Sequence, residues 1–222
     1  MSKLMDAVVI LAGDPPSGYA RRLLARKAAA GCPLIAADAG ADRLRDTGFS
    51  PDVIVGDGDS LQGSFPGARL VSYPRRKDFT DGQAALELAL SRAEGRVWLL
   101  GVLGGRPDHQ LANLLLPLSC PDCSRVRLAG GDWQGRYLSS GSHLLRGRIG
   151  DTVSLLPLTP VTGLSLSGFE YPLTDHQALP GDSRTLSNVL SEETGRVSLK
   201  DGCLLAIRIL SGKETDDDAE DQ

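Results

Sequence analysis

Short apolar runs that are typical of buried strands alternate with helix-like segments through the first part of this chain. Six such runs occur, at residues 8–12, 34–37, 53–55, 69–73, 97–100 and 125–129. Segments rich in alanine and leucine follow the first, fourth and fifth runs, as expected of helices. Alternating strands and helices form a mostly parallel sheet with helices on its faces. The pattern therefore predicts an N-terminal α/β/α domain over residues 1–132.

The pattern changes after residue 132. From about residue 137 the chain shows short β-type runs separated by turn residues, and no convincing helix. These runs lie at residues 153–156, 164–166, 197–199 and 204–210. They predict a smaller all-β domain, a sandwich or barrel, over residues 137–212. Residues 213–222 hold six acids and one lysine, and we expect them to form a disordered acidic tail.

The charge balance excludes some classes of partner. The formal net charge of the 222 residues is −4, and the tail alone carries −5, so the remainder is close to neutral. A near-neutral body offers no basic groove for nucleic acid and no basic patch for a membrane surface. The start of the chain lacks a signal-like pattern, and no run of 18 apolar residues occurs, so we expect a cytoplasmic protein.

Acidic or glycine-rich stretches follow four of the predicted strands. The second strand runs into Asp38, the third into Asp57 and Asp59, and the fourth into the stretch 77–81. The fifth ends in the stretch 104–109, which is rich in glycine. In a parallel sheet the ligand crevice lies outside the carboxyl ends of the strands. We therefore expect these residues to gather at one edge and to form the site.

The stretch Asp57-Gly58-Asp59 is the strongest single indication of a metal site. In near-extended backbone, residues i and i+2 point to the same side, roughly 6–7 Å apart. Two converging carboxylates repel each other unless a cation lies between them, and Mg²⁺ suits carboxylates that work beside phosphate. The alternative is a plain polar turn, because Asp and Gly are common turn residues.

The neighbouring stretches add charges of both signs. Asp78 and Asp81 open a predicted helix, where Thr80 with Gln83 fits a capping box; carboxylates are favoured at such a position whatever their function. Lys77 is placed to neutralise phosphate oxygens. The sequence of Gly104, Gly105 and Arg106 before a helix predicts an anion site, and beside it His109 is the one histidine in the crevice.

The sequence lacks three common motifs of nucleotide-binding proteins and hydrolases. These are the G-x-x-x-x-G-K-[ST] phosphate-binding loop, the G-x-G-x-x-G fingerprint and the G-x-S-x-G nucleophile turn. The inventory favours metal-assisted transfer of a phosphoryl-type group over nucleophilic catalysis. Such chemistry depends on positioning and charge neutralisation.

Taken together and in order, these stretches resemble the thiamine pyrophosphokinase family, also called thiamine diphosphokinase. The matching stretches are residues 37–43, 51–60, 77–81 and 103–113, followed in the β half by 168–173 and 186–188. The resemblance runs from the first strand to about residue 210. It implies an N-terminal domain that binds ATP and Mg²⁺ and a C-terminal domain that binds thiamine. It also implies a homodimer with each active site between one subunit's α/β domain and the other's β domain.

The resemblance also assigns roles to residues. It implies that Asp57, Asp59 and Asp81 hold Mg²⁺, with Asp78 close by. The residues that it places along the phosphate and substrate crevice are Asp38, Lys77, Gly104, Gly105, Arg106, Asp108 and His109. On the thiamine side it places Tyr171, Ser187 and Asn188.

The implied reaction transfers the pyrophosphoryl group of ATP to the hydroxyl of thiamine, giving thiamine diphosphate and AMP. Two departures leave the acceptor open. The family usually has a bulky apolar residue where Gly58 stands, and often tryptophan where Tyr171 stands. The alternatives are a pyrophosphokinase acting on a hydroxymethylpterin, and a non-catalytic module that binds nucleotide or thiamine.

Overall fold

The computed structural model describes residues 4–74 and 76–210 of the chain. The chain divides into two compact units, residues 1–131 and 132–222. The predicted acidic tail at 213–222 lies outside the described residues. No helix in the described ranges is long and apolar enough to cross a membrane.

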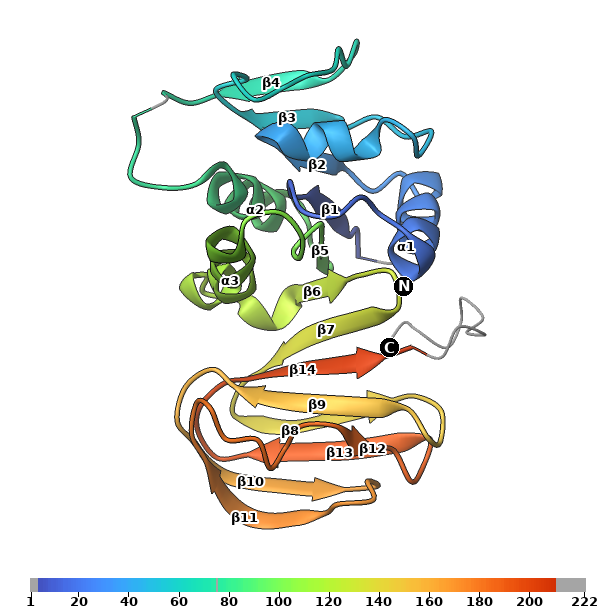
Figure 1. The fold of residues 1–222 in the computed structure, drawn as a ribbon, viewed down its shortest axis with the longest axis vertical. Coiled ribbons are helices and arrows are strands. Elements are labelled where there is room, and N and C mark those ends of the chain that lie inside the picture. Colours follow the sequence, from blue (N-terminus) through green and yellow to red (C-terminus); the bar gives the residue numbers. More distant parts are fainter. Residues whose placement is uncertain (1–3, 75, 211–222) are drawn as a thin grey trace. The chain divides into compact units, whose positions relative to one another are not determined.

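The first unit is built on a parallel sheet (Figure 1). Its described strands are β1 (Ala7–Ile10), β2 (Leu34–Ala37), β3 (Val53–Gly56), β4 (Arg69–Ser72), β5 (Val97–Leu100) and β6 (Val126–Ala129). They pair in parallel in the order β6-β5-β1-β2-β3-β4. β1, β2, β3 and β5 are buried along their whole length, whereas the edge strand β4 is largely exposed. The predicted mostly parallel sheet is confirmed, because continuous apolar runs suit strands that are covered on both faces.

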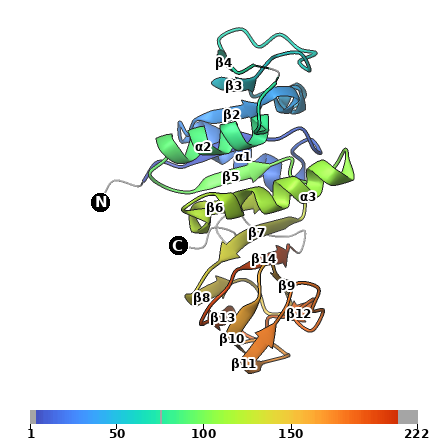
Figure 2. The same ribbon diagram turned by 90° about the vertical axis from the view of Figure 1, so that its left-hand side faces the viewer.

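Helices cover both faces of this sheet. The longer ones are α1 (Gly18–Ala29), α2 (Asp81–Arg92) and α3 (Pro107–Leu115), and the 3₁₀ turns are η1 (Asp38–Leu44), η2 (Leu116–Ser119) and η3 (Cys123–Arg125). α1 lies on one side of β1 and β5, and α2 and α3 lie on the other (Figures 1 and 2). α2 packs against β1, β2 and β3 through a stripe of small apolar side chains.

Local sequence signals set the starts of two helices. The hydroxyl of Thr80 accepts a hydrogen bond of 3.1 Å from the backbone N–H of Gln83, so Thr80 caps α2. The other half of the predicted capping box is absent, because the Gln83 side chain donates to Glu87 instead. Pro107 is the first residue of α3, where its missing N–H costs nothing.

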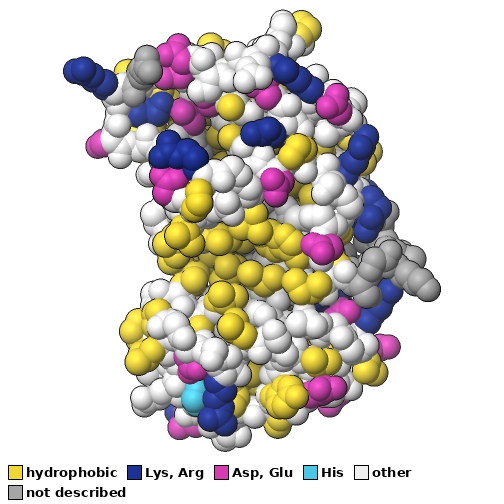
Figure 3. All heavy atoms as spheres, viewed as in Figure 1, with side chains coloured by type: hydrophobic (Ala, Val, Ile, Leu, Met, Phe, Trp, Pro, Cys, Tyr) yellow, Lys and Arg dark blue, Asp and Glu magenta, His cyan; other side chains and the backbone are white. Residues whose placement is uncertain are grey.

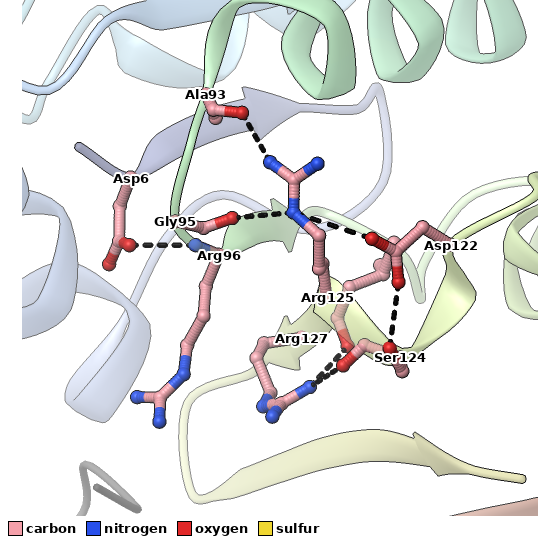
Figure 4. A network of polar contacts seen from close by, with 9 residues as sticks. Asp6, Ala93, Gly95, Arg96, Asp122, Ser124, Arg125 and Arg127 are labelled. Carbon is pink, nitrogen blue, oxygen red and sulfur yellow. Dashed lines mark hydrogen bonds and ion pairs between the residues drawn. The ribbon is translucent and has the colours of Figure 1, made fainter. Parts of the chain in front are cut away.

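A polar network joins the amino ends of β1, β5 and β6, at the edge opposite the acidic turns (Figure 4). The Arg125 guanidinium donates to the carbonyl oxygens of Gly95, at 2.8 Å, and Ala93. The backbone N–H of Arg96 donates to the Asp6 carboxylate at 2.7 Å. These bonds satisfy backbone groups that the strands leave open and fix the strand starts relative to one another.

The second unit is a β-sandwich, which confirms the predicted all-β half. Its described strands are β7 (Trp133–Leu138), β8 (Gly141–Arg146), β9 (Thr152–Pro157), β10 (Val161–Ser167), β11 (Leu173–Ala178), β12 (Asn188–Val189), β13 (Thr194–Leu199) and β14 (Leu204–Ile209). Antiparallel pairing gives two sets, β12-β9-β14-β7 and β11-β10-β13-β8. One apolar cluster draws Leu155 and Leu204 from the first set and Leu164 and Val197 from the second. Residues 132–210 contain no helix in the described structure.

Candidate functional site

Gly56, the last residue of β3, is the point around which two predicted site residues meet. A Cβ at this position would lie 2.9 Å from the Cβ of Asp38, 3.3 Å from Asp38 Oδ1 and 3.2 Å from Asp81 Oδ1. Asp38 directly follows β2 and Asp81 opens α2. The carboxyl ends of neighbouring parallel strands therefore bring these two carboxylates together, as the sequence predicts. The absence of a side chain on Gly56 makes the room for them.

Asp38 is held in an unfavourable state. Its backbone has φ of +42°, in the left-handed region that few residues other than glycine adopt. Its Oδ1 atom is buried and has no hydrogen-bond partner among the described residues. Buried carboxylate oxygens are normally paired, and strained, unsatisfied groups concentrate at functional sites. The position suits a cation or a donor group of a ligand.

Lys77 places a positive charge next to the Asp81 carboxylate. Its Nζ atom lies 2.7 Å from Asp81 Oδ1, and its side chain is 10% exposed. The ammonium also lies 5.8 Å from the ring centres of both Tyr73 and Phe79, which themselves pack edge to face. An ion pair and two aromatic rings thus fix the end of this long side chain.

Asp57 and Asp59 stand in a turn rather than in extended backbone. The Asp57 carboxylate accepts a hydrogen bond of 3.1 Å from the backbone N–H of Asp59, and Gly58 between them has φ of +78°. This segment therefore adopts the polar turn that was the alternative to extended backbone. In such a turn the short Asp side chain accepts a hydrogen bond from the backbone two residues further along the chain. In the described ranges, no three His, Cys, Asp or Glu side chains stand close enough to hold a metal ion. The Mg²⁺ ligand set of Asp57, Asp59 and Asp81 stays a prediction.

A second charged group marks the start of α3. The exposed Arg106 guanidinium donates two hydrogen bonds to the Asp108 carboxylate, at 2.6 and 3.1 Å. This pairing lowers the pKa of Asp108 to about 2 and raises the pKa of Arg106. His109 beside them is exposed, and so is Asp78 before α2. All four are open to a ligand in solution.

Gly104 and Gly105 both have positive φ, at +95° and +74°. A Cβ on Gly104 would lie 2.1 Å from the carboxylate of Asp14, which follows β1, whereas one on Gly105 would meet open space. The glycine turn after β5 is thus pressed against the end of β1. Ligands of open α/β sheets bind where the strand order reverses, which here is between β1 and β5.

Sequence reasoning missed two residues of this edge. Asp14 is one, because a single acid before two prolines gives no signal of its own. Asn113 of α3 is the other: its Oδ1 atom lies 3.8 Å from where a Cβ on Gly82 would stand, at the start of α2. The sequence pointed to Asn113 only through its position in residues 103–113, one of the stretches that resemble the family.

The three predicted thiamine-side residues lie together in the second unit. Asn188 is buried, and its amide pairs with the backbone of Tyr171: Nδ2 donates to the Tyr171 carbonyl at 2.8 Å, and Oδ1 accepts from the Tyr171 N–H at 3.1 Å. Ser187 has φ of +52°, and its N–H donates to Ser154 Oγ. Tyr171 is 63% exposed. Asn188 therefore positions Tyr171 through its backbone.

Two sequence models of one family match the chain. The first, "Thiamin pyrophosphokinase, catalytic domain", matches residues 27–127, and the second, "Thiamin pyrophosphokinase, vitamin B1 binding domain", matches residues 142–204. Together they cover well over half of the chain, in the order of the two units.

Individual relatives carry the same name. The thiamine pyrophosphokinase of Bacillus subtilis is 29% identical over 185 residues, which is 78% of this chain and 86% of the relative. Thiamine pyrophosphokinase 2 of Arabidopsis thaliana is 26% identical over 207 residues, 79% of this chain and 77% of the relative. The solved structure of the B. subtilis protein has a TM-score of 0.79 at 25% identity and covers 93% of this chain and 100% of its own. A thiamin pyrophosphokinase family protein from Enterococcus faecalis has a TM-score of 0.75 at 27% identity, covering 93% of this chain and 99% of its own.

Proposed function

The chain belongs to the thiamine pyrophosphokinase family, and we propose that it transfers the pyrophosphoryl group of ATP to the hydroxyl of thiamine. The products are thiamine diphosphate and AMP. The observation that carries the proposal is the pair of matched domains, together with the carboxylates and the lysine gathered around Gly56 in the first of them.

The triphosphate of ATP would lie along the carboxyl ends of the strands in the first unit. Asp57, Asp59 and Asp81 would hold Mg²⁺, with Asp78 close by, and the ion would offset charge on the phosphate oxygens. The buried Asp38 Oδ1 beside Asp81 has no hydrogen-bond partner in the part of the chain that the structure describes, so it suits such a cation. The donor set is all oxygen, as Mg²⁺ requires.

The chain's own groups would do the positioning. Lys77 and Arg106 carry the positive charges that face the phosphates, and the turn at Gly104 and Gly105 lets the nucleotide approach the backbone. In the transfer, the thiamine hydroxyl attacks the β-phosphorus and AMP leaves. Charge neutralisation and alignment supply most of the catalysis in such reactions.

The second unit would bind thiamine. The exposed Tyr171 ring offers a flat surface on which an aromatic ligand can stack, and Asn188 fixes that residue through two backbone hydrogen bonds. Ser187 lies next to it and is exposed. The match of residues 142–204 to a vitamin B1 binding domain favours thiamine over a pterin acceptor.

We further propose that the working protein is a homodimer. α3 buries none of its residues in the single chain, although it carries Leu111, which is 63% exposed, and Leu115, which is 49% exposed. Apolar side chains gather at the surface around this helix (Figure 3). A helix with exposed leucines is expected to bury them against another subunit.

The cytoplasmic location stays a prediction.

The test is to measure AMP and ADP separately after the protein is incubated with ATP and Mg²⁺, with thiamine, with 6-hydroxymethylpterin, or with neither. The proposal predicts AMP only with thiamine, matched one for one by thiamine diphosphate. ADP in place of AMP would refute transfer from the β-phosphorus. AMP with the pterin alone would move the assignment to that acceptor.

A further inference from the structure

The structure points to Lys77 as an internal counter-ion that occupies the Asp81 carboxylate until a divalent cation and a nucleotide arrive. We propose that the ammonium then moves from Asp81 to a phosphate oxygen. This inference rests on the proposed function, because it assigns a role to one residue of that same site.

Two carboxylate oxygens and one ammonium lie close to Gly56. Asp38 Oδ1 and Asp81 Oδ1 flank the same point, at 3.3 and 3.2 Å from where a Cβ on Gly56 would stand. The Lys77 ammonium contacts Asp81 Oδ1 at 2.7 Å, while Asp38 Oδ1 has no hydrogen-bond partner among the described residues. Among the described residues, Lys77 thus pairs with one of the two carboxylates, and Oδ1 of the other has no hydrogen-bond partner.

The Lys77 ammonium and a metal ion compete for Asp81 Oδ1. Mg²⁺ binds carboxylate oxygens at about 2.0–2.1 Å. A cation bound to Asp81 Oδ1 would therefore be a close neighbour of an ammonium on the same atom, and like charges at such a distance repel strongly in a partly buried site. A metal ion that binds Asp81 Oδ1 therefore has to displace Lys77 from that atom.

The Lys77 ammonium can exchange one oxygen partner for another, although its contacts hold it beside Asp81 in this structure. Lysine carries its charge at the end of a flexible four-carbon stem, unlike the rigid fork of arginine. The rings of Tyr73 and Phe79 lie 5.8 Å from the ammonium. Both offer a weak cation–π attraction that does not depend on Asp81. The ammonium therefore keeps favourable contacts while it shifts towards the phosphates that the metal brings.

A consequence is that metal and nucleotide bind cooperatively. Without nucleotide, a divalent cation has to displace Lys77 and leave its charge unpaired. With nucleotide, the displaced ammonium gains a phosphate oxygen. Removing the Lys77 charge should therefore strengthen metal binding to the nucleotide-free protein and weaken the effect of nucleotide on it.

The test is a titration of the full chain with Mn²⁺, in which free Mn²⁺ is measured by electron paramagnetic resonance. The titration is run with and without α,β-methylene ATP, an analogue that cannot release AMP, and the Mn²⁺ that the analogue binds without protein is subtracted. Without nucleotide, Lys77→Met should bind Mn²⁺ about tenfold more tightly than the wild type. Lys77→Arg keeps the charge and should bind no more tightly than the wild type.

Lys200→Met is the matched control. Lys200 lies 2.7 Å from Asp175, the same distance as in the Lys77–Asp81 pair, but in the second unit. Its loss changes the net charge equally and should leave Mn²⁺ affinity unchanged. Thermal unfolding of each variant checks that the fold is intact.

Two results would overturn the inference in distinguishable ways. If Lys77→Met binds Mn²⁺ no more tightly than the wild type, while both bind it with nucleotide, the role of Lys77 falls and the proposed function stands. If the wild type binds no Mn²⁺ even with the nucleotide analogue, the metal–nucleotide site itself falls and the inference with it.

Discussion

At the scale of single residues, the site depends on what is missing from Gly56. A side chain there would meet Asp38 and Asp81 at 2.9–3.3 Å, and the backbone φ of +154° is one that residues with a Cβ rarely adopt. The end of β3 can therefore bring two carboxylates together only because it is glycine.

Gly56→Ala should abolish thiamine-dependent AMP formation and destabilise the protein by about 2–3 kcal/mol, since it adds a clash to backbone strain. The matched control is Gly67→Ala. Gly67 has φ of +96°, but a Cβ there would meet nothing within 4 Å. The control should lose only about 1 kcal/mol and keep its activity, as measured by urea unfolding and product assay. Equal losses of activity in the two variants would refute the steric argument.

The ion pair between Asp6 and Lys27 predicts how stability depends on pH. The two charges lie 2.9 Å apart and are almost fully buried. Burial alone would raise the pKa of Asp6, but hydrogen bonds from Lys27 and from the Arg96 N–H outweigh it, and the pKa of Asp6 lies below its ordinary value. The stabilisation is therefore complete above the unfolded pKa of about 3.9 and is lost as the pH falls through the lower folded pKa.

Asp6→Asn should lower the free energy of unfolding by about 3 kcal/mol at pH 7, because it removes the carboxylate of a buried ion pair and leaves the Lys27 charge in place. The difference from the wild type should shrink as the pH is lowered below 4, where the wild-type carboxylate also becomes protonated. Urea unfolding at pH 7, 4 and 3 measures this. A difference that stays constant over that range would contradict the linkage.

At the scale of elements, local chemistry made much of the first unit predictable. The strand runs, the Thr80 cap and Pro107 at the start of α3 are all fixed by residues within one turn of the position concerned. The leucines at residues 107–115 correctly predicted helix α3. They did not reveal that Leu111 and Leu115 would remain exposed in the single chain. The conformation of residues 57–59 was not predictable from the two-residue alternation of a strand, because the Asp57 carboxylate accepts a hydrogen bond from the Asp59 N–H and forms a turn. The pairing of Asn188 with Tyr171 joins residues 17 positions apart and leaves no local signal.

The cap of α2 also sets the position of Asp81, which is the residue that follows it. Thr80→Ala should destabilise the protein by about 1 kcal/mol, because the Gln83 N–H loses its acceptor. It should also raise the KM for ATP, since the first turn of α2 carries Asp81. Thr80→Ser keeps the hydroxyl and should restore both quantities. A Thr80→Ala variant with unchanged stability and unchanged KM would show that the cap does not support the site.

At the scale of the whole molecule, we propose that the first unit binds nucleotide, that the second binds thiamine, and that two copies of the chain form a dimer. Light scattering should report a dimer for the wild type. Replacing Leu111 and Leu115 together by glutamate should give a monomer, because two charges cannot be buried in an apolar contact. Leu70→Glu, at an exposed position on the edge strand β4, is the control and should remain dimeric. A monomeric wild type would contradict this part of the account.

We propose that chemistry takes place where the carboxyl ends of the parallel strands bring Asp38, Asp81 and Lys77 together. The chain offers a matched pair of variants for it, because Asp81 and Asp175 each lie 2.7 Å from a lysine. The measurement is the rate of thiamine-dependent AMP formation by Asp81→Asn and by Asp175→Asn. We expect the first to be slower than the wild type by about a thousandfold or more, as for loss of a group that stabilises the transition state, and the second to be unchanged. Equal rates in the two variants would contradict the account.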